Sequence, residues 1–153
     1  MPNNEPIRDV TPEAEQIARA VRAWLQTYPN KPVTKVDVEY LGEGTAITIS
    51  TVQAAYKTRQ FITGDYQAQY QFSLLYKAFP TTTTARLEAD EILNDYALWA
   101  VQNTSDLADR LPEKCQFTRL ARDTPAALLG RDADGSEVHQ ILFTLLYEVK
   151  KYG

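Results

Sequence analysis

The fold is decided by the stretch DYQAQYQFSLLYKAF, which runs from Asp65 to Phe79. Its even-numbered positions hold mostly aromatic and aliphatic residues, and its odd-numbered positions hold mostly glutamine, serine and lysine. Successive side chains of a strand point to opposite faces, so this alternation predicts one long strand with an apolar face and a polar face. Such a strand is a scaffold and carries no catalytic motif.

Two segments have the periodicity of amphipathic helices. The first begins at Thr11-Pro12, where threonine suits the N-cap and proline the first helical position, and it ends at Pro29. The second is expected from about Ala85 to Gln102. Residues 105–111 suit a short helical turn. In both main helices apolar residues recur at spacings of three and four: Ala14, Ile17, Ala18, Val21, Leu25 and Tyr28 in the first, and Ala89, Ile92, Leu93, Tyr96 and Ala100 in the second.

Further strands are expected on both sides of the long one. Residues 35–40 and 46–52 should form a hairpin around Gly42-Glu43-Gly44, and residues 59–63 should enter a tight type II′ turn at Gly64-Asp65. Residues 54–58 are ambiguous between strand and loop. Two more strands are expected after the second helix, at 115–122 and 138–149.

The predicted order is therefore α-β-β-β-β-α-β-β. This order indicates an α+β fold with a mostly antiparallel sheet of about five to six strands and two main amphipathic helices. Residues 1–10 are expected to form a mobile N-terminal lead-in, and residues 11–153 a single domain.

Composition excludes several classes of protein. The 153 residues suffice for a domain that folds without metal or disulfides. A net charge of -4 gives no electrostatic drive toward a nucleic-acid backbone, which argues against a sequence-specific DNA or RNA binder. The single cysteine fits a reducing compartment. No stretch approaches the roughly 18 apolar residues that a membrane span needs, and no signal peptide is visible at the start of the chain.

The residues that could carry chemistry are few. Cys115 and His139 are the single cysteine and the single histidine, and they lie on different predicted strands, so a pair is geometrically conceivable. A nucleophile also needs an activated thiolate and an orienting group, and the sequence points to neither. A buried structural thiol and a strand-end histidine are the favoured interpretations. No metal and no cofactor is expected, because zinc sites need several ligands at close spacing.

Acidic residues and aromatic residues have ordinary interpretations as well. Asp132-Ala133-Asp134-Gly135 resembles part of a calcium loop but is better explained as a polar turn. Glu88, Asp90, Glu91 and Asp95 should form a solvated helix face. Aromatic side chains at strand and helix spacings belong more often to a core than to a ligand pocket. The sequence thus predicts a protein that is not an enzyme.

Several stretches together resemble a known family. Tyr70–Pro80, Ala85–Glu88 and Ile92–Trp99 are similar to the centre of the tail terminator proteins of long-tailed bacteriophages, which in prophages often carry the label minor capsid protein. The Pro125 segment and the closing strand Val138–Tyr147 fit the end of that family. The order of elements matches across most of the chain.

The resemblance implies a structural virion assembly protein without enzymatic activity. Six copies would form a hexameric ring on the completed tail tube, stop its polymerisation and offer a head-joining surface. The implied partners are a second copy of the chain, the tail tube protein and the head–tail connector protein. The implied location is the head-proximal end of the virion tail, after assembly in the host cytoplasm. Two alternatives stay open: a small-molecule-binding or enzymatic α+β domain with an aromatic-lined pocket, and another phage head–tail neck component.

The long strand also suggests where subunits touch. Its polar face is interrupted by Leu75 and Phe79, and the even-numbered face of the closing strand carries Val138, Leu142 and Leu146. Either a helix of the same chain or a neighbouring subunit must cover such side chains. The glutamines in the first half of this face favour the neighbouring subunit. These five residues are therefore the predicted subunit-interface candidates.

Overall fold

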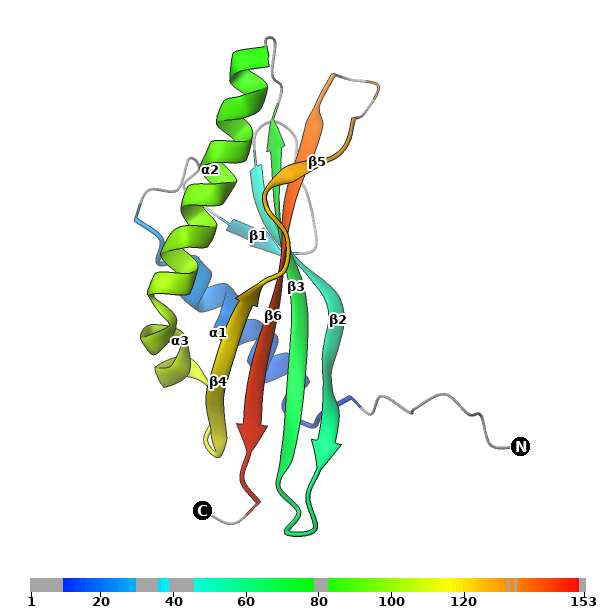
Figure 1. The fold of residues 1–153 in the computed structure, drawn as a ribbon, viewed down its shortest axis with the longest axis vertical. Helices are drawn as coiled ribbons and strands as arrows, with labels where there is room; N and C mark the ends of the chain where they lie inside the picture. The colour runs from blue at the N-terminus through cyan, green and yellow to red at the C-terminus, as the bar shows by residue number, and fades with distance from the viewer. Residues whose placement is uncertain are drawn as a thin grey trace, which may run out of the picture.

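The computed structural model describes residues 10–29, 36–38, 46–78, 83–131, 133 and 135–151. Three helices lie on one side of a six-stranded sheet, with the long strands running along the longest axis of the molecule (Figure 1). The fold is α+β with a mostly antiparallel sheet, as predicted. The elements in chain order are α1 (Ala14–Leu25), β1 (Val36–Val38), β2 (Ala46–Gln60), β3 (Tyr66–Ala78), α2 (Thr83–Gln102), α3 (Thr104–Arg110), β4 (Cys115–Arg122), β5 (Ala127–Arg131) and β6 (Glu137–Val149).

The last strand lies in the middle of the sheet. The spatial order is β1-β2-β3-β6-β4, and β5 pairs with the first part of β6. β3 and β6 pair without interruption from Tyr66↔Val149 to Ala78↔Glu137. Both strands alternate in sequence with a period of two, so this unbroken register aligns the apolar face of one with the apolar face of the other. The β3–β6 pair is therefore the centre of the sheet.

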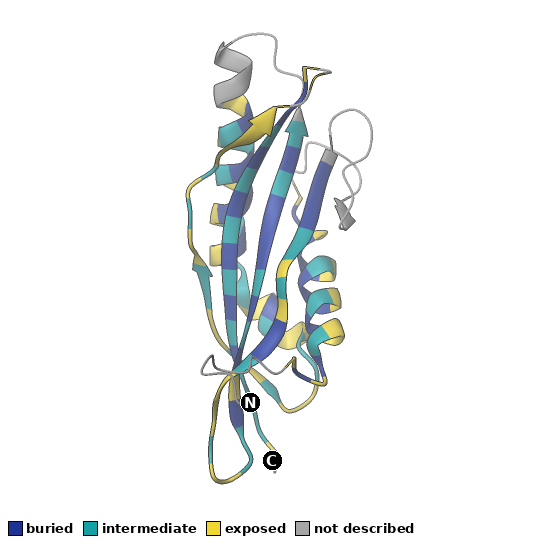
Figure 2. Ribbon diagram, turned by 90° about the vertical axis from the view of Figure 1, so that its right-hand side faces the viewer, coloured by how far each residue is buried: buried dark blue, intermediate teal, exposed yellow. Residues whose placement is uncertain are grey.

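The core lies between this apolar face and the helices. The rings of Phe72 and Phe143 stack across the β3–β6 pair with centroids 5.1 Å apart, and both residues are buried. Helices α1 and α2 cover this apolar face of the sheet, and their side chains Ile17, Val21 and Leu93 are fully buried in the core. The opposite face of the sheet is turned to the viewer in Figure 2, where the helices lie behind the strands. No described helix is long and apolar enough to cross a membrane.

An aromatic cluster joins α1 to α2 beside this core. Trp24 is fully buried, stacks on Trp99 with centroids 5.6 Å apart, and donates its indole N–H to the Asn103 carbonyl at 3.0 Å. The Tyr96 hydroxyl donates to the Leu25 carbonyl. A buried polar tip that finds a partner costs little, so the large rings can fill the space between the helices.

The structure corrects two predicted hairpins. β1 pairs with β2 in parallel, with Val36 opposite Ile47, so these segments are not the two arms of a hairpin; residues 42–44 lie outside the described residues. β2 continues through residues 54–58, which the sequence left ambiguous, to Gln60. Its pairing with β3 shifts register along this stretch. The turn that follows is longer than a type II′ turn: the Phe61 N–H bonds to the Asp65 carbonyl and the Gly64 N–H to the Phe61 carbonyl. Gly64 has a φ of 93°, the conformation that such a three-residue loop requires.

The first helix begins two residues later than predicted. Glu13 is its N-cap, while the Thr11 hydroxyl forms a hydrogen bond with the Tyr147 hydroxyl at 3.1 Å instead of capping the helix. Val10 forms an isolated bridge with Tyr56, so the end of the expected lead-in is attached to the sheet. The rest of the lead-in lies outside the described residues.

Candidate functional site: the uncovered face of the sheet

The structure does not bring Cys115 and His139 together. Cys115 is paired with Val149 and His139 with Tyr76, at opposite ends of β6, which separates them by roughly 30 Å along the strand. Burial, and then the nearby Glu13 carboxylate, raise the pKa of the Cys115 thiol to about 11. The thiol therefore stays protonated at neutral pH, which is the state expected of a structural cysteine.

His139 is a fully buried residue within a charged network. Its Nδ1 lies 2.7 Å from the Asp90 carboxylate and its Nε2 lies 3.3 Å from the Glu137 carboxylate. The second oxygen of Glu137 pairs with the Arg131 guanidinium at 2.9 Å. The prediction that Asp90 belongs to a solvated acidic face is wrong, because Asp90 lies at the edge of the helix stripe that packs on the sheet. The network fastens α2 and β5 to β6.

A second polar network ties the start of α1 to the opposite end of the sheet. The buried Glu13 carboxylate accepts hydrogen bonds from the Tyr66 hydroxyl at 2.8 Å and from the Tyr147 hydroxyl at 3.0 Å. With every polar atom partnered, such a network is rigid. Among the described residues, no group of three or more histidine, cysteine or acidic side chains could hold a metal ion. The two networks join α2 and α1 to opposite ends of the sheet.

The second network makes the fold sensitive to alkali. Burial first, and then the Glu13 carboxylate, raise the pKa of Tyr66, and burial raises the pKa of Tyr147, from an ordinary value of 10.0. The contribution of these two tyrosines to stability is fully present below about pH 10. It is lost as the pH rises further, because only the unfolded chain then releases these protons. Each tyrosine contributes a slope of up to about 1.4 kcal/mol per pH unit. Denaturant titrations between pH 8 and pH 11 should show this loss.

A variant with Tyr66→Phe and Tyr147→Phe isolates the cause. It removes two of the ionisations, so its free energy of unfolding should fall less steeply above pH 10 than that of the wild type, whatever its value at pH 8. Equal slopes in the two proteins would contradict this explanation.

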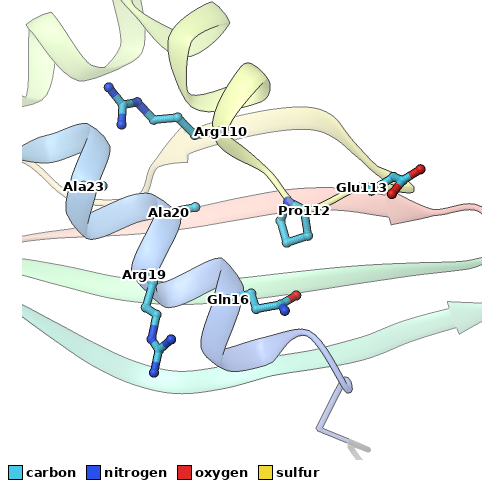
Figure 3. Close-up of a pocket in the computed structure, with 7 residues that line it drawn as sticks. All are labelled: Gln16, Arg19, Ala20, Ala23, Arg110, Pro112 and Glu113. Atoms are coloured by element: carbon cyan, nitrogen blue, oxygen red, sulfur yellow. The ribbon is translucent and has the colours of Figure 1, made fainter.

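An open groove with a volume of about 660 Å³ lies between α1 and the end of α3 (Figure 3). Ala20 and Ala23 form part of its wall, and the guanidinium groups of Arg19 and Arg110 flank it. Arg19 is paired with Glu15 at 2.6 Å and Arg110 with Asp106 at 3.2 Å. No aromatic residue lines this groove, so it does not match the aromatic-lined pocket of the alternative interpretation.

The structure places four of the five predicted interface residues on one surface, the face of the sheet opposite the helices. Leu75, Val138, Leu142 and Leu146 are half-buried there, and Phe79 lies outside the described residues. The register sets Leu142 opposite Ser73 and Leu75 opposite Gln140. Leu75, Val138 and Leu142 therefore lie near the end of the β3–β6 pair at which β3 leads into α2. No described helix packs over them (Figure 2). We call this surface the open face.

The other half of the open face is polar. Leu146 is the one aliphatic side chain of the β3–β6 pair there, with Arg119 of β4 on one side and Gln69 on the other. Further toward the β2–β3 turn, Gln67 lies between Arg59 and Glu148. The open face therefore has an apolar end and an end rich in amides and cations.

Sequence reasoning missed β5, which borders the apolar end. Its side chains are exposed on both faces, and Leu128 and Leu129 keep 40% and 55% of their surface accessible. The signal for it is the short apolar run between Pro125 and Gly130, which is bounded by turn residues as a strand would be. Of the turn that follows, Asp132 and Asp134 lie outside the described residues, and Gly135 has a φ of 89°.

Comparison with known proteins gives a structural match alone. No family model matches the chain, and no match was found among curated proteins. Among solved structures, a chain from the virion of a native gene transfer agent particle superposes with a TM-score of 0.59 at 12% sequence identity. The match covers 86% of this chain and 97% of the other. The two chains share a fold.

Proposed function

We propose that this protein is a structural component of a virion, and specifically a tail terminator. In this role six copies form a ring on the finished tail tube, stop its polymerisation and present a surface to the head–tail connector protein. The protein works by assembly and has no catalytic activity. Its place is the head-proximal end of the tail, and it reaches this place in the host cytoplasm.

The observation that carries the proposal is the open face. In the part of the chain that the structure describes, no helix packs on one face of the sheet, and the apolar end of that face holds Leu75, Val138 and Leu142. Fully burying one such side chain contributes about 1.5–3 kcal/mol, and these half-buried ones contribute part of that. A neighbouring subunit is the covering element that a ring supplies.

Three further observations support the same role. The fold is shared with a chain of a virion particle, and the shared region includes nearly all of that chain. The net charge of -4 suits a ring through which DNA must pass without being held by its phosphates. The clusters that could have carried catalysis, at His139 and Glu13, are occupied by internal hydrogen bonds.

Native mass spectrometry and light scattering of the purified protein test the proposal. We expect a closed ring of six copies, either in solution or on tubes of the tail tube protein seen by electron microscopy. Adding the protein during tube polymerisation should arrest growth at one end.

The alternatives give different results. Another neck component would bind the connector without arresting the tube, and a small-molecule-binding domain would stay a monomer. A stable dimer both in solution and in assembled particles would refute the proposal.

A further inference from the structure

We infer that the open face of one subunit is covered by helix α2 of a second copy. The inference rests on the proposed ring and names the two surfaces that would join its subunits. The contact on the helix is a ridge of exposed residues, which we call the α2 ridge: Glu88, Glu91, Asp95, Leu98, Val101 and Gln102.

The α2 ridge is the outward side of the helix. Its members recur at spacings of three and four, so they form one stripe, while Leu93 and Tyr96 belong to the buried stripe on the other side. Leu98 and Val101 keep 51% and 37% of their surface accessible, although they are aliphatic. The helix has no lysine or arginine from Glu88 to Gln102. The ridge is therefore acidic along its first half and apolar near its end.

The open face has the complementary character. The register places three cationic side chains on it, Arg59, Lys77 and Arg119. Two carboxylates lie on it as well: Glu148, which is paired with the Lys150 ammonium at 3.2 Å, and Asp123, which accepts a hydrogen bond from the Thr144 hydroxyl at 2.6 Å. Packing two open faces together would oppose cations, and packing two ridges together would oppose carboxylates. Complementary charge thus favours a ridge on an open face over either surface on itself.

The shapes of the two surfaces agree with this pairing. α2 has 20 residues and is about 30 Å long, and β3 and β6 have 13 residues each and extend over about 44 Å. The helix can therefore lie within the length of the face, with Leu98 and Val101 free to meet its leucines.

The position of the two surfaces determines the kind of assembly. They lie on opposite sides of the subunit, because the helices cover one face of the sheet and the open face is the other (Figures 1 and 2). Each copy then offers one of each surface, and contacts repeat head to tail. Such heterologous contacts close into rings when the rotation between subunits permits.

Two charge-reversed variants test the inference. The ridge variant carries Glu91→Lys with Asp95→Lys, and the face variant carries Arg59→Glu with Arg119→Glu; all four residues are exposed. We expect that each variant alone stays monomeric by native mass spectrometry and keeps the circular dichroism spectrum of the wild type. An equal mixture should restore the oligomer with both variants in equal numbers, because every contact again joins opposite charges.

The control variant carries Asp109→Lys with Glu113→Lys. It changes the net charge by the same amount as the ridge variant, at exposed positions outside both surfaces, and should leave assembly unchanged. A ridge variant that assembles like the wild type, or a mixture that stays monomeric, overturns the inference while the ring itself stands. A mixture that associates into open chains or into rings of another size supports the contact but contradicts the proposed hexamer. A wild type that never associates, alone or on tubes, overturns both.

Discussion

Replacing Phe143 with alanine should lower the free energy of unfolding by about 3–5 kcal/mol. Phe143 is 1% exposed, stacks on Phe72, and lies at the centre of the β3–β6 pair, where the helices close the core. The truncation removes a large buried ring and leaves a cavity that rigid strands on both sides cannot fill. Urea denaturation followed by the fluorescence of the buried Trp24 measures the change.

The neighbouring Leu142 gives a matched control on the same strand. It points to the open face and is half-buried, so Leu142→Ala should cost about 1 kcal/mol or less in the isolated subunit. A large loss at Leu142, comparable with that at Phe143, would mean that an element of the same chain covers the open face. That result would also remove the basis of the proposed interface.

The double substitution Leu75→Lys with Leu146→Lys should abolish assembly and leave the subunit folded. The two leucines lie on the open face, and two ammonium groups there would have to be desolvated beneath a partner at a large cost. We expect a monomer by light scattering with a wild-type circular dichroism spectrum. Failure to fold would place these residues in the core.

The control for this variant adds the same charge elsewhere. Ile62 is fully exposed in the turn between β2 and β3, and Thr63 beside it is exposed as well. Ile62→Lys with Thr63→Lys should leave both folding and assembly as they are in the wild type. Equal loss of assembly in the control would point to net charge and away from the open face.

Elements with a long, strict period could be predicted from the sequence. β3 was expected at 65–79 and runs from Tyr66 to Ala78, and α2 was expected from about 85 and runs from Thr83 to Gln102. In these segments local preference and burial agree, because one face of each packs on the core. The alternation of residue types in β3 and β6 also predicted which side chains lie on the open face and which lie on the buried face.

The features that the sequence could not predict depend on distant residues. Nothing local to β1 reveals whether it pairs with β2 in parallel, since the direction of pairing is set by the path of the chain between them. The hydrogen bond between Asp90 and His139 follows from the packing of two elements that are far apart in sequence. The charge of the open face has the same origin, because Arg59 becomes a neighbour of Gln67, and Arg119 a neighbour of Leu146, only through strand pairing.

The central position of β6 has a consequence for the time at which a subunit becomes able to assemble. β3 pairs with a strand about 60 to 80 residues further along the chain, so closing the sheet requires a long loop and should be slow for a domain of this size. The apolar end of the open face combines Leu75 from β3 with Val138 and Leu142 from β6. During synthesis this surface does not exist until β6 has left the ribosome. A nascent chain whose β6 has not yet emerged therefore cannot join a neighbour through this surface, and only subunits with a completed sheet can do so.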